Sequence, residues 1–225
     1  MFIGHYAASF ALKSCNKNAS LGFLFIAVQF VDILFFPLTL LGIEHFRLIE
    51  NFTEATHFSL DFMPYSHSLV ATFFWGAATF TFVFFALFKH HQLRLKLAMV
   101  FAIAVISHWF FDLLVHTPDL PLITDNSLKV GFGLWNNDVL TYILESVILI
   151  AGLYLYMRSS TGVTKIAKYG MPVFIVVLLG INIINIFGPL SPQDNETTTA
   201  VSAVVAYFAF ALIAWFLDRN RVSNS

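Results

Sequence analysis

The chain has 225 residues, of which 58% are hydrophobic and only 11% are charged, and 27 of them are phenylalanine. These polar side chains are too few to cover the surface of a soluble globule. The composition therefore excludes a soluble protein and predicts an integral membrane protein. The formal net charge of −1 gives no electrostatic reason to expect nucleic acid as a partner. The single cysteine, Cys15, excludes an intrachain disulfide and a cysteine-based zinc site.

Six apolar runs are long enough to cross the hydrocarbon layer of a bilayer, which takes roughly 20 helical residues. They are Leu21–Ile43, His67–Phe88, Leu97–His116, Val139–Met157, Met171–Leu190 and Thr199–Leu217. A shorter segment, Phe2 to Leu12, precedes them, and we expect it to enter the membrane as a half-helix that brings His5 to mid-membrane depth. The expected fold is an all-α bundle of about six transmembrane helices plus this N-terminal half-helix, in a single domain of residues 1–225.

Basic residues gather on one side of the expected membrane. Of the 12 lysines and arginines, only Arg47 and Lys129 lie in the acidic connections on the other side. By the positive-inside rule, this asymmetry predicts that both termini are cytoplasmic.

The most informative stretch closes the third run, where His108, Asp112 and His116 follow one another at intervals of four residues. On a helix this spacing aligns the three side chains along one stripe. Ionisable groups in the bilayer centre cost on the order of 3 kcal/mol each, so they need partners or water inside the protein. Asp32, in the first run, lies at a similar depth.

Five candidate ligands from four segments are expected to converge on one cavity: His5, Asp32, His67, His108 and Asp112. Neutral imidazole and carboxylate suit a divalent metal, above all zinc, with iron or manganese as other candidates. We predict that the last four lie close enough to share one ion and that His5 completes the shell. Coordination to one cation would satisfy these groups together. The alternative for each residue is structural: a hydrogen-bonded core histidine, a helix cap at His67, or a buried hydrogen bond between His108 and Asp112.

Glu145 and His116 are the candidates for catalytic roles. Glu145 lies within an apolar run that offers no basic partner, so it is a partner of a ligand histidine, a general base or a protonated core residue. His116 lies at the rim, where it either contacts substrate or extends toward water. Asp119 is expected to be a turn residue. The acidic loop Glu44–Ser66, with four phenylalanines, is expected to cover the site as a lid.

The order of these residues resembles one known family. Gly4-His5-Tyr6, Val31-Asp32-Ile33, Ser66-His67-Ser68-Leu69 and the His108/Asp112 pair are similar to motifs of the inner-membrane metal-dependent hydrolases of the YdjM-like, LexA-binding family. That family is distantly similar to the phospholipase C and P1 nuclease group of helical zinc hydrolases. The resemblance, which extends to about Leu122, implies the same five metal ligands, a hydrolase activity and a bacterial inner (plasma) membrane. The chain departs from the family's Pro-Asp-x-Asp pattern at residues 31–34, where a carboxylate is missing.

The function expected from the residues and the resemblance is metal-dependent hydrolysis of a phosphoester or lipid-linked substrate from the outer side, with membrane lipid as a partner. Two other functions stay open. In an ion- or proton-coupled transporter, Asp32, His108, Asp112 and Glu145 would form a relay. In a noncatalytic membrane scaffold, the ionisable residues would only pair with one another.

Overall fold

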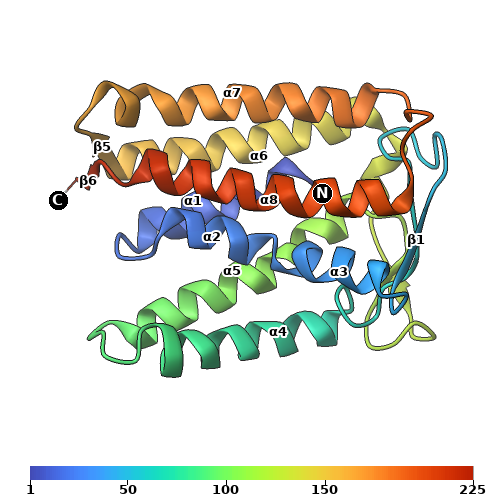
Figure 1. Cartoon of the computed structure of the whole chain (residues 1–225), viewed down its shortest axis with the longest axis horizontal. Coiled ribbons are helices and arrows are strands. Elements are labelled where there is room, and N and C mark those ends of the chain that lie inside the picture. Colours follow the sequence, from blue (N-terminus) through green and yellow to red (C-terminus); the bar gives the residue numbers. More distant parts are fainter. Residues whose placement is uncertain (225) are drawn as a thin grey trace.

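Five helices in the computed structural model, which describes residues 1–224, are long and apolar enough to cross a membrane (Figure 1). They are α4 (Leu69–Phe82) with its continuation η2 (Val83–Leu87), α5 (Arg94–Val115), α6 (Asp138–Ser159), α7 (Lys165–Phe187) and α8 (Glu196–Asp218). A sixth span is formed when α2 (Leu21–Val28) and α3 (Phe30–Leu40) are counted together. The all-α helix bundle predicted from the sequence is therefore confirmed.

The first span is bent rather than continuous. The axes of α2 and α3 differ by 53°, and Gln29 between them has non-helical backbone angles (φ −100°, ψ 7°). The side chain of Gln29 is fully buried, and its Nε2 donates to the carbonyl oxygen of Phe2 at 3.3 Å. The bend therefore brings the end of α2 and the start of α3 into the interior of the bundle, next to the N-terminal segment.

The N-terminal segment forms η1 (Ile3–His5) and α1 (Tyr6–Cys15), as the half-helix prediction requires. It packs closely against α6, because a Cβ atom at Gly152 would lie only 2.7 Å from the carbonyl oxygen of Ala7. Met1 is buried within the bundle, whereas the chain ends at the left of Figure 1. Thus α1 enters from one end and stops midway.

The two ends of the bundle differ in composition. The left end in Figure 1 carries the α1–α2 and α4–α5 turns and the strands β5 (Ser160–Gly162) and β6 (Arg221–Ser223). Here Lys13 forms an ion pair with Asp218 at 3.0 Å. The basic connections that predict the orientation therefore lie at this end, whereas Arg47 and Lys129 lie in strands at the opposite end.

The opposite end carries an antiparallel hairpin of β1 (His45–Leu48) and β2 (Phe58–Phe62), the short strands β3 (Leu120–Pro121) and β4 (Lys129–Val130), and η3 (Leu134–Asn136). The hairpin lies within Glu44–Ser66, the loop that is expected from the sequence to cover the site as a lid. Arg47 crosses it to Asp61, with N–O distances of 2.5 and 2.9 Å. These hydrogen bonds hold the pKa of the Asp61 carboxyl below its ordinary value.

Candidate metal centre

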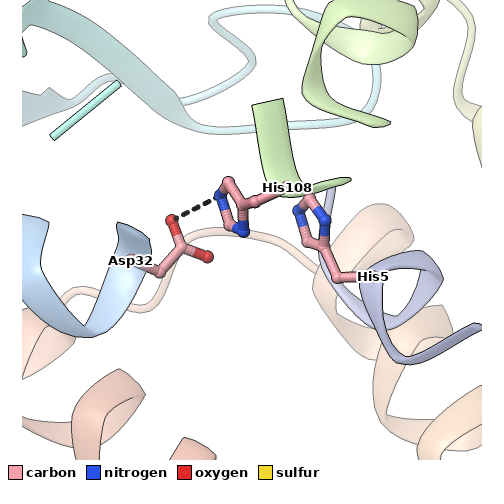
Figure 2. A group of neighbouring side chains, drawn as sticks. All are labelled: His5, Asp32 and His108. Atoms are coloured by element: carbon pink, nitrogen blue, oxygen red, sulfur yellow. Dashed lines mark ion pairs between the residues drawn. The ribbon is translucent and has the colours of Figure 1, made fainter. Parts of the chain in front are cut away.

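The five predicted ligands meet inside the bundle, where α1, α3, α5 and the segment before α4 come together. They form two groups of three, each with ligand atoms within 4.8 Å of one another: His5, Asp32 and His108 (Figure 2), and His67, His108 and Asp112. All except Asp32 are buried. The structure brings the five residues together as two overlapping groups that share His108, and not as the single set of five that the sequence predicts.

The Nε2 atoms of the histidines face carboxylate oxygens. The Nε2 of His108 lies 3.0 Å from Asp112 Oδ2 and 3.6 Å from Asp32 Oδ1, the pair joined by the dashed line in Figure 2. The Nε2 of His67 lies 3.2 Å from Asp32 Oδ1, and that of His5 lies 3.1 Å from Asp112 Oδ1. Ligand atoms around a tetrahedral zinc ion, each about 2.1 Å from it, are about 3.4 Å apart. The observed separations bracket this value.

The proton on the His108 ring is placed by the bend in the first span. Nδ1 of His108 lies 2.7 Å from the carbonyl oxygen of Val28, the last residue of α2. Because a carbonyl only accepts, Nδ1 carries the proton, and Nε2 of the neutral ring keeps a lone pair. This buried Nε2 has no hydrogen-bond partner within residues 1–224. The lone pair of Nε2 and the oxygens of Asp32 and Asp112 could all bind one cation placed between them.

His67 is oriented by a second chain of hydrogen bonds. The buried Glu44 carboxylate accepts from the backbone N–H groups of Tyr65 and Ser66 at 2.8 and 2.9 Å and from the Ser66 hydroxyl at 2.6 Å. Because Ser66 gives its only hydroxyl proton to Glu44, its oxygen accepts from Nδ1 of His67 at 2.7 Å. With Nδ1 held as the donor, a neutral His67 ring would offer the lone pair of Nε2 to a bound cation; without a cation, Nε2 donates to Asp32 Oδ1 at 3.2 Å.

His116 repeats this arrangement, although it was expected to lie at a rim. The helix α5 ends one residue earlier, at Val115, and His116 is buried, so it does not extend toward water. Its Nδ1 is 2.8 Å from Asp119 Oδ1, and its Nε2 is 3.7 Å from Asp112 Oδ1. Asp119 is thus more than the turn residue that the sequence predicts, because it orients a histidine at the site.

Glu145 takes none of the roles that require contact with a ligand histidine. Its carboxylate accepts hydrogen bonds from the backbone N–H groups of Phe2 and Gly4 at 3.2 to 3.3 Å, so it holds the start of the N-terminal helix. The amino group of Met1 lies beside it and contacts Asp112 Oδ1 at 2.7 Å. Sequence reasoning missed this contact, since no side-chain pattern signals the position of a main-chain amine.

The cluster lies at the inner end of a cavity of about 380 Å³. Its polar end is formed by Asp32, His67, Asp112, His116 and Glu145. The walls are mostly apolar and come from α3, β2, α7 and α8: Phe35, Phe36, Phe58, Leu60, Ile181, Ile186, Ala203 and Ala206. Tyr207 also lines the cavity, and its hydroxyl donates to Asp32 Oδ2 at 3.1 Å. The candidate centre is therefore accessible to a molecule that fits an apolar passage.

The donor set fits a divalent cation. Neutral imidazoles and two carboxylates are ligands of borderline ions such as zinc, and a charge of +2 offsets that of Asp32 and Asp112. Within residues 1–224, no lysine or arginine lines the cavity; the amino group of Met1 pairs with Asp112, and neither a lysine, an arginine nor an amino group pairs with Asp32. Buried histidine and aspartate groups in this chain could therefore hold a metal ion.

Comparisons with protein-family models, with curated proteins and with solved structures find no match to this chain.

Proposed function

We propose that the chain is a membrane-embedded, metal-dependent hydrolase of phosphoesters. The observation that carries the proposal is the common orientation of His67, His108 and His116. Each ring has Nδ1 within 2.8 Å of an outer hydrogen-bond partner and Nε2 directed toward Asp32 or Asp112. Outer partners of this kind orient ligand histidines in metalloenzymes. A purely structural cluster would not require all three rings to turn Nδ1 outward and Nε2 toward the aspartates.

The metal would be held by His5, Asp32, His67, His108 and Asp112, with zinc as the first candidate and iron or manganese as alternatives. When bound, it supplies a Lewis acid that polarises water and stabilises negative charge on a phosphoryl oxygen.

The remaining polar groups act on substrate and protons. His116 lines the cavity beside the ligands, so its Nε2 is placed to accept the proton of an attacking water and return it to the leaving oxygen. Asp119 stabilises the positive charge that the ring then carries, through the bond at Nδ1. Tyr207 donates to Asp32 and holds that carboxylate in its orientation.

The same proposal includes membership of the YdjM-like family, which the residue order resembles, and a bacterial inner-membrane location. The basic end of the bundle faces the cytoplasm by the positive-inside rule, which places the β1–β2 hairpin and the cavity beneath it toward the outer side. A reporter enzyme that works only in the cytoplasm should then be active when it is fused after Ser225. Activity of a fused reporter that works only outside the cytoplasm would contradict this orientation.

Metal content tests the proposal directly. The detergent-purified protein is expected to contain near-stoichiometric zinc, iron or manganese by mass spectrometry of the elements and to hydrolyse a phosphodiester. The double variant His108→Ala, Asp112→Ala should lose both, whereas the exposed hairpin variant Asp61→Asn should keep both. Full metal content in the double variant would refute the site. Metal-free wild-type protein with proton-coupled flux would support a transporter instead.

The contacts of Glu145 argue against the relay that the transporter hypothesis requires. Its carboxylate is engaged by the N–H groups of Phe2 and Gly4 rather than by Asp112. Protonation of Glu145 would weaken these hydrogen bonds, so a relay through it would loosen the start of the N-terminal segment. Hydrolysis therefore remains the function that the geometry supports best.

A further inference from the structure

The cavity above the candidate centre is covered at the end of the bundle. The β1–β2 connection crosses this end and is attached on two sides. His57 Nε2 lies 3.0 Å from the carbonyl oxygen of Gly188, after α7, and the backbone N–H of Ala55 donates to the carbonyl oxygen of Trp135 at 2.9 Å. Ala55 itself lines the cavity. The hairpin thus lies across this end of the cavity and lines part of it.

The side of the cavity between α7 and α8 is open. Asn185 of α7 and Ser202 of α8 both line the cavity and are both exposed on the outer surface of the bundle. Farther along α8, the cavity is lined by Ala203 and Ala206, whose side chains leave space between the helices.

The surface around this opening is apolar. Ile184 on α7 is 73% exposed, and Val205 on α8 is 62% exposed. Both belong to helices that are long and apolar enough to cross a membrane. Ala206 lies ten residues into α8, which starts at Glu196, so the opening reaches about 15 Å below the end of that helix. The opening therefore faces the hydrocarbon of the bilayer over much of its length.

We propose that the opening between α7 and α8 is a lateral portal through which an acylated phosphoester of the membrane enters the cavity. The later hydrolysis of this phosphoester rests on the proposed hydrolase function, whereas its entry and binding do not. The acyl chain lies along the apolar walls and extends out past Ala203 and Ala206. The phosphoester head lies at the polar end, near Asp32 and Asp112.

Charge supports a phosphoester head over a cationic one. A divalent ion and the Met1 amino group together balance the three carboxylates of the polar end, Asp32, Asp112 and Glu145, so this end is no longer negative and accepts a phosphodiester anion without repulsion. The apolar walls match an acyl chain, because such a chain can move from the hydrocarbon of the bilayer to these walls without exposing its methylene groups to water. A free soluble phosphate ester would gain nothing from these walls.

The experiment uses full-length protein in nanodiscs and a phosphatidylglycerol with a photoactivatable group in its acyl chain. In the wild type, the probe is expected to label the cavity-facing parts of α7 and α8. Ala206→Trp should fill the passage and reduce this labelling by about tenfold, equivalent to about 1.4 kcal/mol of binding. Val205→Trp, on the neighbouring but outward-facing position of the same helix, is the matched control and should label as the wild type does.

Two further measurements separate the portal from the hydrolase. Metal content should stay unchanged in Ala206→Trp, whereas hydrolysis of phosphatidylglycerol should fall together with its labelling. If labelling falls in Ala206→Trp and no variant hydrolyses any ester, the portal stands and the hydrolase fails. If Ala206→Trp does not fold, Ser202→Trp at the exposed mouth replaces it. Wild-type labelling in a folded portal variant would overturn the proposal.

Discussion

Glu44→Gln is the sharpest test of the hydrogen-bond chain that orients His67. The glutamine oxygen must remain at the position of Oε1, because two backbone N–H groups donate to that atom at 2.8 and 2.9 Å. Its amide nitrogen then faces the Ser66 hydroxyl in place of Oε2 and donates to it. Ser66 must turn its own proton toward His67 Nδ1, so the ring carries its proton on Nε2, facing Asp32.

The expected loss of metal affinity in Glu44→Gln follows from the cost of returning the His67 ring to the tautomer that can bind the metal. For His67 to offer its Nε2 lone pair in the variant, Nδ1 must be protonated again, and one buried donor of the chain is left without an acceptor. An unsatisfied buried donor costs about 1–3 kcal/mol. This corresponds to a loss of metal affinity of about 5- to 150-fold, which overlaps the 10- to 100-fold range of other outer-partner substitutions.

Two measurements check this reasoning. Competition with a chelator gives the zinc affinity, and the ¹⁵N shifts of the labelled imidazole report which His67 nitrogen carries the proton. Glu50→Gln makes the same change at an exposed position of the same loop and should alter neither quantity. The metal-free variant should unfold at about the wild-type temperature, since Nε2–H then donates to Asp32. Zinc affinity within about threefold of wild type in Glu44→Gln would refute the proton assignment.

Three further outcomes are expected. Gly152→Ala should destabilise the protein by about 1–3 kcal/mol in thermal unfolding and lower its metal content, because the new Cβ meets the backbone of Ala7. Gly180→Ala, where no heavy atom lies within 4 Å of the new Cβ, should not destabilise the protein, since alanine favours the helix, and equal losses of stability would contradict this packing argument. Asp119→Asn should keep the metal but reduce turnover by about 10- to 100-fold, because the His116 ring stays oriented and loses its charge partner; a loss of metal instead would make Asp119 a structural residue. Because the pKa of Asp61 is lowered in the folded state, the stability that Asp61 contributes to the hairpin is present above the ordinary carboxyl pKa and is lost as pH falls through the lowered one. The protection of the hairpin amides from hydrogen exchange, relative to the intrinsic rate at each pH, should therefore fall in acid, and equal protection of the wild type and Asp61→Asn at neutral pH would refute the contribution.

The apolar runs predicted the helices because a membrane span is specified by length and hydropathy alone. They did not predict the break at Gln29, because the residues on both sides of it are apolar and one glutamine does not by itself interrupt a helix. The hairpin was also missed. The alternation of Phe58, Leu60 and Phe62 with Ser59 and Asp61 is a strand signal that could have found it.

For the site, depth counting brought His5, Asp32 and His108 together correctly, because each helix fixes the height of its residues. The outer partners were not predictable in this way. Glu44 lies 22 residues before Ser66, and the acceptor of His108 is a main-chain carbonyl 80 residues away. Such pairs depend on how loops fold back and on where a helix stops, which periodicity does not encode.

The bend between α2 and α3 has a consequence for anyone who wishes to build this centre into another protein. In an unbroken helix, the carbonyl of residue 28 would be taken by the N–H of residue 32, and His108 would face a backbone with no acceptor to offer. Its proton could then settle on the nitrogen that should bind the ion. A designed bundle of ideal straight helices could therefore reproduce every ligand at its correct height and still bind poorly. The interruption must be copied first, and the histidine placed against it.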